Sequence, residues 1–576
     1  MSEDFGSVIL ISEFKNMTIP QLKTSEPVTE SSPQIYAING QDLKKLVGST
    51  LLWLKAHQQL INSLNVFPVP DGDTGTNMLL TMQAAYNEIV NSHEHNIGKM
   101  AKDLAQGALM GARGNSGVIL SQIWRGFARA LDSFPEMDAQ LFSRALTESK
   151  NTAYKGVVRP VEGTILTVIK DVATAIENSV GKTTNLVELL TDAVNAADAS
   201  VKYTPELLPI LKTAGVVDSG GKGLFILLEG MLRHVNQQSL EASDITLQSI
   251  SSMTMKETMD AVEEGQDVEV VIDFQPRGAF DLNSFYNDLS RIGTSIQVGE
   301  GDGMYRMHIH VEAEKQNEPL IYVSSIGSWS KVAMENLQIQ MGNSTNKKSD
   351  YTLNEFKPGS IAVIAISPGV GISKIFASLG VAAIVEGGQT MNPSTEEILN
   401  AFEDLPSDQI IILPNNKNIV LAAETAQTLS VKNVKVVPSV NIPQGLSALL
   451  RLDPEGDLEE IVQEMVLALS DVDAGEITTA TRTVDLNGVE VLSGENIGLM
   501  NGKLVVSGKT TSETTIALLK KANMDEKERV TLFTGDNISP EEVVAITSQV
   551  QDEFPDHEIE VHEGGQPHYQ FLISLE

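Results

Sequence analysis

Residues 65–78 read Asn65-Val66-Phe67-Pro68-Val69-Pro70-Asp71-Gly72-Asp73-Thr74-Gly75-Thr76-Asn77-Met78, a turn that leads into an apolar, helix-like run. Only Gly72 separates Asp71 from Asp73, so a tight turn can direct both carboxylates at one point, and Mg²⁺ favours a few carboxylates completed by water and phosphate oxygens. Thr74, Thr76 and Asn77 fall in the first helical turn, where unpaired N–H groups suit a phosphate. The stretch predicts a Mg²⁺–nucleotide site, although Asp and Gly are also ordinary turn residues.

A glycine-rich stretch follows at Gly107-Ala108-Leu109-Met110-Gly111-Ala112-Arg113-Gly114-Asn115-Ser116-Gly117, ahead of another apolar run. Glycines let the backbone approach a ligand closely and adopt positive φ, so that successive N–H groups can surround a phosphate. Close helix packing is the alternative role for these glycines, but it does not explain Asn115 and Ser116. We therefore expect a phosphate-binding loop here.

These stretches resemble the nucleotide-binding motifs of the DhaL family, the ATP-using part of bacterial dihydroxyacetone kinases, and more closely those of its fatty acid kinase branch, the FakA proteins. Two further segments, 159–166 and 215–223, stand in the same order as nucleotide-site loops of that family. The resemblance implies ATP and Mg²⁺ as cofactors and Asp71 and Asp73 as catalytic, metal-binding carboxylates. It assigns nucleotide binding to Thr74, Thr76, Asn77, Gly114, Asn115, Ser116, Gly117, Thr164, Asp218 and Gly220.

Asn65 departs from the dihydroxyacetone kinase pattern, which has a third Asp upstream of the pair. An amide can ligate a metal through its oxygen but carries no charge. FakA-like proteins carry Asn in this string, so we interpret Asn65 as a feature of that branch and expect it as the third metal ligand.

Composition limits the function further. A chain of 576 residues predicts three or four domains. The net charge of −35 would repel nucleic-acid phosphates and anionic membranes, and the absence of cysteine excludes disulfides, thiolate zinc sites and a catalytic cysteine. No apolar run approaches the length of a membrane span, so we expect a cytoplasmic protein.

The N-terminal third of the chain is expected to be helical. Residues 1–36 are rich in Ser, Thr, Glu and Pro and predict a mobile leader. From residue 39 onward, apolar positions recur at helical spacing and predict one buried face; in the first run they are Leu43, Leu46, Val47, Leu51, Leu54, Leu60, Ile61 and Leu64. We expect an all-α, DhaL-like ATP-binding domain over 37–236, followed by a linker at 239–256.

A small α+β domain is expected over 257–342, where short strands at 268–274, 295–298 and 306–311 surround one helix-like segment. Its His308-Ile309-His310 resembles the His-x-His strand of FakA middle domains. Many relatives hold zinc there with a Cys on the first strand, and the matching position here is Val271. Two histidines without a third ligand make a poor zinc site. Asp273 could replace the missing ligand, but we predict a structural pair and no metal.

The segment 357–576 predicts an α/β domain with a parallel sheet, since the apolar runs 360–367, 381–385, 409–413 and 434–437 alternate with helical segments. Loops 386–395 and 414–418 follow two of these runs, at the strand ends where open sheets bind ligands. Both resemble the C-terminal domain of FakA, which is related to the DegV fold of fatty-acid-binding proteins. Gly-Gly-Gln occurs at 387–389 and again at 564–566, which does not establish a repeat.

Three functions fit these features. The resemblance favours an ATP-dependent kinase subunit that phosphorylates the carboxylate of a fatty acid presented by a separate fatty-acid-binding protein of the DegV/FakB type, and we expect a homodimer. A carboxylate is already ionised at neutral pH, so its attack requires mainly alignment and charge neutralisation. A ketone or polyol kinase of the dihydroxyacetone type is the second candidate, although no ketone-binding segment is found, and a nucleotide-binding regulatory scaffold is the third.

Overall fold

The computed structural model describes residues 33–66, 72–240, 248–249, 268–278, 280–301, 304–336, 353, 359–389, 391–480, 484–486, 488–492 and 494–576. Most of the expected leader and most of the expected linker at 239–256 lie outside these ranges. The end of the expected leader is described, and it belongs to the helical core. Ile35 packs against that core, its N–H donates to Asn185, and its carbonyl accepts from Leu186.

The N-terminal part is a bundle of helices, which confirms the all-α prediction. The helices are α1 (Gly40–Ala56), α2 (Gln58–Leu64), α3 (Thr74–Ile89), α4 (Ile97–Met110), α5 (Gly114–Leu131), α6 (Ala139–Lys155), α7 (Ile165–Ser179), α8 (Leu186–Leu207), α9 (Pro209–Ala214) and α10 (Ser219–Val235). One short antiparallel pair joins β1 (Ala37–Ile38), just before α1, to β2 (Met137–Asp138), between α5 and α6.

The first two helices show how the amphipathic pattern folds. Asn39 begins α1 as a capping box with Asp42, so the first N–H groups are bonded. The apolar stripe is buried as predicted at Leu43, Val47 and Leu54, but Leu60 is 46% exposed. That part of the prediction was wrong because α1 ends at Ala56 and α2 starts afresh at Gln58, so the helical phase shifts and Leu60 turns towards solvent.

The middle part is an α+β unit, as predicted. Its strands lie in the order β3-β5-β6-β4-β7, and its elements are β3 (Gln248–Ser249), β4 (Val268–Pro276), α11 (Leu282–Leu289), β5 (Thr294–Gly301), β6 (Met304–Val311), α12 (Glu318–Ile326) and β7 (Gly327–Asn336). The strand β3 falls inside the expected linker, and β7 was not predicted. Val271 on β4 pairs directly with His308 on β6, so a valine stands beside the histidine where a third metal ligand would be needed.

The first C-terminal sheet is parallel, as predicted, in the order β11-β10-β8-β9. Every residue of β8 is buried, because helices cover both faces, and this explains its continuous apolar sequence. The elements of this unit are β8 (Ala362–Ser367), α14 (Val370–Ser378), β9 (Ala383–Glu386), α15 (Thr395–Glu403), β10 (Gln409–Leu413), α16 (Val420–Leu429), β11 (Asn433–Val436), α17 (Ile442–Leu449) and α18 (Leu458–Ala468).

A second C-terminal sheet has the order β16-β15-β12-β19-β17-β18. Only β17 and β18 are parallel neighbours, and the other pairs are antiparallel. Its elements are β12 (Asp473–Thr479), β15 (Asn496–Met500), β16 (Lys503–Gly508), α19 (Thr511–Lys521), β17 (Arg529–Gly535), α20 (Pro540–Glu553), β18 (Glu558–Gln566) and β19 (Tyr569–Leu575), with a separate hairpin of β13 (Val484–Leu486) and β14 (Val489–Val491).

The second Gly-Gly-Gln has a packing role. A Cβ added at Gly369, just before α14, would lie 2.5 Å from the carbonyl oxygen of Gly564. The glycines therefore let α14 start directly against β18.

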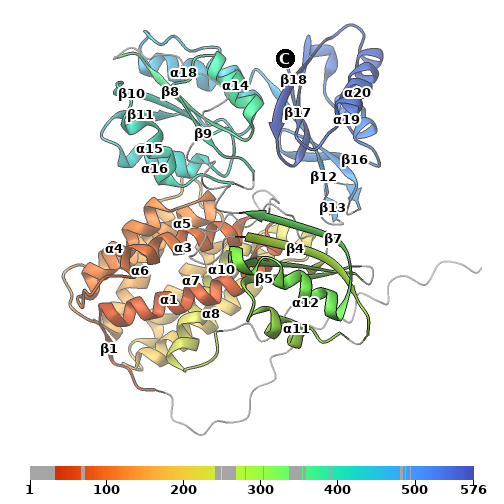
Figure 1. Cartoon of the computed structure of the whole chain (residues 1–576). Coiled ribbons are helices and arrows are strands. Elements are labelled where there is room, and N and C mark those ends of the chain that lie inside the picture. The colour runs from red at the N-terminus through yellow and green to blue at the C-terminus, as the bar shows by residue number, and fades with distance from the viewer. Residues whose placement is uncertain are drawn as a thin grey trace, which may run out of the picture.

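The parts are stacked on one another (Figure 1). The helical bundle lies beside the middle sheet, and the first C-terminal sheet lies above the bundle, with α16 against α5 and α15 against α4. One buried apolar cluster crosses this boundary. It joins Ala112 and Val118, from the glycine-rich stretch and α5, to Ile398, Phe402 and Ala423 of the C-terminal part.

Candidate functional site

Asp73 is the first residue of the site. It stands at the N-cap position of α3, and the residue is only 6% exposed. Its Oδ1 accepts a hydrogen bond from Nδ2 of Asn65 at 3.5 Å. Asn65, at the end of α2, is buried as well, so the structure brings together two of the three expected metal ligands. The third, Asp71, lies outside the described residues with 67–70.

The first turn of α3 is held by α2, which sequence reasoning missed. Asn62 Oδ1 accepts from the N–H groups of Gly75 and Thr76, at 2.7 and 3.1 Å. The hydroxyl of Thr76 accepts from Asn62 and from Gln58. Some N–H groups expected to face phosphate thus bind a protein amide, and Thr76 faces α2.

The glycine-rich stretch meets α3 at Gly114. Gly114 has φ +56°, and a Cβ added to it would lie 2.5 Å from Nδ2 of Asn77. Gly117 is equally close to α3, since a Cβ added there would collide with Thr81 Oγ1. Asn77 is buried. Glycine is therefore required at 114 both by conformation and by the approach of Asn77.

Asn115 and Ser116 lie in the first turn of α5, and their roles differ from the simple expectation. Asn115 Nδ2 donates to Oδ1 of Asn418 in the C-terminal part, at 3.1 Å. Ser116 is partly exposed. The N-cap residue of α5, Arg113, makes no side-chain capping bond, so the N–H groups of this turn lack the side-chain cap that α7 and α10 possess.

The segment 215–223 reaches α3 through Ser219, whose hydroxyl donates to the hydroxyl of Thr74 at 3.1 Å. Asp218 caps α10 through the N–H of Gly221 at 2.6 Å and also accepts from the N–H of Ile165 at the start of α7. Burial raises the pKa of Asp218 to about 7, against the lowering effect of these two N–H groups. Asp218 thus ties two helix N-termini together.

The remaining predicted positions lie close by. Thr164 caps α7 through the N–H of Leu166 and donates its hydroxyl to the Val161 carbonyl. Gly220 lies in the first turn of α10, and a Cβ added to it would lie 3.4 Å from the Cβ of Ile165.

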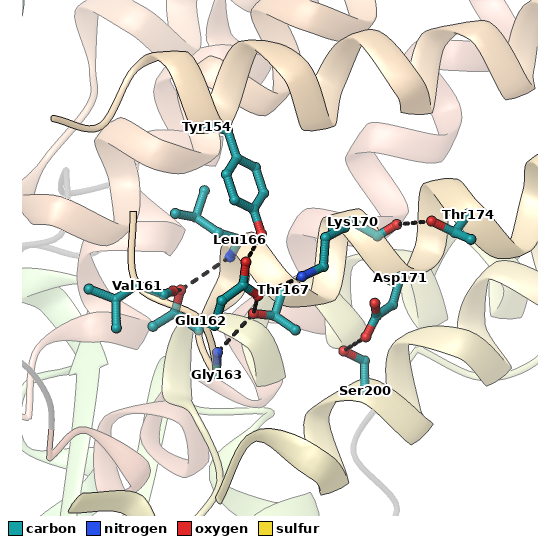
Figure 2. Close-up of polar contacts among 11 residues, drawn as sticks. Tyr154, Val161, Glu162, Gly163, Leu166, Thr167, Lys170, Asp171, Thr174 and Ser200 are labelled. Carbon is teal, nitrogen blue, oxygen red and sulfur yellow. Dashed lines mark hydrogen bonds and ion pairs between the residues drawn. The ribbon is translucent and has the colours of Figure 1, made fainter. Parts of the chain in front are cut away.

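The 159–163 loop is organised by Glu162 (Figure 2). Its carboxylate accepts from Tyr154, from Thr167 and from Lys170, the last two at 2.6 Å. Burial pushes the pKa of Glu162 upwards, but these three donors and the charge of Lys170 outweigh it, so the pKa lies below its usual value. Thr167 also accepts from the N–H of Gly163. The loop is therefore fixed to α7, although nothing in the sequence marks Glu162 beyond its place in the segment.

Together these contacts bring the N-termini of α3, α5, α7 and α10 to one end of the bundle. Asn77 and Gly114 join α3 to α5, Thr74 and Ser219 join α3 to α10, and Asp218 joins α10 to α7. Each N-terminus contributes about half a positive charge. A chain of net charge −35 thus offers a locally favourable place for a polyphosphate, with the Asp73 carboxylate beside it for a cation.

The site is covered by the loop between β9 and α15. Asn392 Nδ2 donates to Oδ2 of Asp73 at 2.5 Å. Arg113 donates to the Asn392 carbonyl and forms an ion pair with Glu397 at 3.1 Å. Sequence reasoning marked this loop as a ligand-binding loop but gave no signal that it meets Asp73.

No other metal-binding group emerges from the described residues, where no cluster of three or more His, Cys, Asp or Glu side chains could hold an ion. The His308–His310 pair stays a prediction. Within the same ranges, each helix is too short or too polar to cross a lipid bilayer.

Comparison with known families gives three matches along the chain. Residues 68–233 match the DAK2 domain. Residues 264–344 match the middle domain, and 362–576 the C-terminal domain, of the FakA-like proteins, a family named after one subunit of fatty acid kinase.

Several relatives match over nearly the whole chain, two of which illustrate the range of identity. An uncharacterized protein of Staphylococcus haemolyticus is 39% identical over 554 residues, covering 94% of this chain and 100% of that protein. An uncharacterized protein of Staphylococcus aureus is 37% identical over 549 residues, with the same coverage.

Several solved structures each match 38% of the chain, among them two fatty-acid-related proteins. The Fatty Acid Kinase B3 protein of Streptococcus pneumoniae loaded with linoleic acid has 12% identity, a TM-score of 0.27 and 99% of its own chain covered. DegV, a fatty acid binding protein from Bacillus subtilis, has 14% identity and a TM-score of 0.28, also with 99% covered.

Proposed function

Because the chain belongs to the FakA-like family of fatty acid kinase proteins, we propose that it is the ATP-dependent kinase subunit of a fatty acid kinase. The observation that carries this proposal is the meeting of four helix N-termini with the Asp73 carboxylate in the part of the chain that matches the DAK2 domain. We assign this activity to residues 37–236 and its location to the cytoplasm.

ATP and Mg²⁺ are the proposed ligands of this site. Asp73, Asp71 and Asn65 would hold the metal, which neutralises phosphate charge during transfer. The fit rests on two observations. The N-terminus of α5 has no side-chain cap, and the buried Oδ1 of Asn392 beside Asp73 has no hydrogen-bond partner among the described residues. An acceptor of this kind suits a metal-bound water.

The proposed acceptor is the carboxylate of a fatty acid. One carboxylate oxygen forms a bond to the γ-phosphorus of ATP while the bond to the bridging oxygen breaks, which gives acyl phosphate and ADP. No proton has to be removed from the acceptor at neutral pH, so the reaction requires alignment and charge neutralisation rather than a general base. The described amides and hydroxyls at the site suit alignment, and the four helix N-termini together with the proposed Mg²⁺ would supply the charge neutralisation.

The family takes its name from one component of a fatty acid kinase, which implies a second component. We propose a fatty-acid-binding protein of the DegV/FakB type that presents the fatty acid, with 257–342 and 357–576 forming its docking surface and a homodimer as the working assembly.

The test is phosphoryl transfer by the full chain. The purified protein is incubated with Mg-ATP and, separately, with fatty acid on a DegV/FakB-type carrier, free fatty acid, dihydroxyacetone and glycerol. Acyl phosphate is trapped with hydroxylamine, and ADP is measured. Asp73→Ala and Asp71→Ala serve as inactive controls.

We expect the parent protein to form acyl phosphate from the carrier-bound fatty acid, and the Asp73→Ala and Asp71→Ala variants to form almost none. Phosphorylation of dihydroxyacetone alone would instead indicate a ketone kinase. Nucleotide binding without transfer to any acceptor would indicate a regulatory scaffold.

A further inference from the structure

The contact between Asn392 and Asp73 links the first C-terminal sheet unit to the helical bundle at the candidate site. The two residues are 319 positions apart, and their side chains meet at 2.5 Å. Both are nearly inaccessible, since Asn392 is 2% exposed and Asp73 is 6% exposed. A polar contact buried to this degree has a defined geometry, because neither group can exchange its partner for water without opening the interface.

The backbone around Asn392 is fixed by the glycine-rich stretch. The Arg113 guanidinium donates to the Asn392 carbonyl at 2.9 Å, and the N–H of Thr395 donates to the Ala112 carbonyl at 3.1 Å. Ser394 forms a β-bridge with Arg113 and also caps α15 in a capping box with Glu397. The loop is therefore attached at Asn392 and just after it, through Ser394 and Thr395, to the segment that carries Gly114.

Two further contacts make this interface more than a single hydrogen bond. Ala112 and Val118 are buried in one apolar cluster with residues of α15 and α16, and Asn115 bonds Asn418. The C-terminal part thus docks on the loop that the proposed function assigns to the nucleotide.

We propose that Asn392 is a positioning residue for Asp73, so that the metal site is complete only when the C-terminal part is docked on the helical bundle. This inference rests on the Mg²⁺–nucleotide part of the proposed function. The amide holds Oδ2 of Asp73 and thereby fixes the plane of the carboxylate that faces the cation. Partners of this kind orient metal ligands, and their loss typically lowers metal affinity or activity 10- to 100-fold.

The opposite effect of the same contact is also testable. An amide N–H on Oδ2 could compete with a cation for that oxygen, in which case the C-terminal part would block the site rather than complete it. The two possibilities differ in sign. Removal of a positioning residue weakens Mg²⁺ binding, whereas removal of a blocking residue strengthens it.

The experiment measures Mg²⁺-dependent ADP binding by the full chain, with no acceptor or carrier present. Asn392→Ala removes the amide and leaves a smaller side chain, whereas Asn392→Leu removes the amide and keeps a similar volume. Because the two substitutions disturb the packing differently, we expect at least one of the variants to fold. Met391→Ala is the matched control, because Met391 is its neighbour and is 58% exposed. Thermal unfolding checks the fold of each variant.

We expect the Mg²⁺ concentration for half-maximal ADP binding to rise 10- to 100-fold in both Asn392 variants and to change less than twofold in Met391→Ala. ADP binding without Mg²⁺ should stay within twofold of the parent. An unchanged or lower Mg²⁺ requirement in a folded Asn392 variant would overturn the proposal. If the parent itself showed no Mg²⁺-dependent nucleotide binding, the proposed function would fail together with it.

Discussion

Gly114→Ala tests the assembled site through a single added methyl group. Gly114 has φ +56°, where a residue with a side chain is disfavoured by roughly 1–2 kcal/mol. The new Cβ would also lie 2.5 Å from Asn77 Nδ2, about 1 Å inside a normal contact distance. Asn77 is 5% exposed and has little space to retreat, so its side chain should move by about this distance. Misplacement of about 1 Å at a reacting site lowers turnover roughly 100-fold.

Gly502→Ala is the matched control for this variant. Gly502 has φ +73°, and a Cβ there would meet nothing within 4 Å. It lies in the turn between β15 and β16, away from the helical bundle. Both substitutions introduce the same kind of backbone strain, and both should lower the Tm of the affected part by about 2–8 °C. Only Gly114→Ala adds the collision with Asn77.

The assay is the initial rate of phosphoryl transfer from radiolabelled ATP at saturating ATP and Mg²⁺, with thermal unfolding measured in parallel. We expect Gly502→Ala to keep turnover within twofold of the parent and Gly114→Ala to lose about 100-fold. A folded Gly114→Ala protein with the turnover of the control would refute the assignment of Asn77 and Gly114 to one site.

Three other predictions concern separate parts of the chain. Burial raises the pKa of Asp218 from 3.8 to about 7, so the stabilising contribution of Asp218 is complete below about pH 4 and is lost as pH rises to 7. Relative to Asp218→Asn, the free energy of unfolding of the parent should fall by about 1.4 kcal/mol per pH unit from pH 5 to 7 and level off at higher pH. A difference that does not change with pH would contradict this prediction. Protein purified without added metal should contain no stoichiometric zinc, and a bound zinc that disappears in His308→Ala would show this prediction to be wrong. A fragment of residues 33–235 should bind Mg-ATP only at a higher Mg²⁺ concentration than the full chain, because it lacks Asn392. It should also form acyl phosphate at least about tenfold more slowly, because the C-terminal contacts that align the site are missing. Equal turnover at saturating carrier would argue against this prediction.

The helices and the parallel sheet could be predicted because their apolar patterns are local. Leu43, Val47 and Leu54 repeat at helical spacing, and β8 is a continuous apolar run, which is what a strand covered on both faces requires. The second C-terminal sheet was less visible. Its neighbours come from distant parts of the sequence, as β12 pairs with β19, and no local pattern specifies such pairing.

The candidate site also combines residues that a local pattern predicts with residues that only the tertiary structure brings together. Asp73, Asn77 and Gly114 could be proposed as site residues from the sequence because their residue types and order suit phosphate and metal binding, and the structure brings them to one end of the bundle. Asn62 was missed because its capping of α3 depends on how two helices meet, and an isolated Asn before a turn has many roles. Asn392 could not be connected to Asp73 by any property of its own stretch, since the connection exists only across the docked interface.

The sequence separation of Asn392 from Asp73 also affects the order in which the two residues are synthesised and brought together. A ribosome adds about 5–20 residues per second, so the 319 positions between them take roughly 16–64 s to synthesise. During that interval the helical bundle can fold without the Asn392 amide, which we propose orients Asp73. If the proposed function holds, a nascent chain would therefore consume little ATP until the far half of the molecule has emerged and docked, and truncated products released early would be much less active than the full chain.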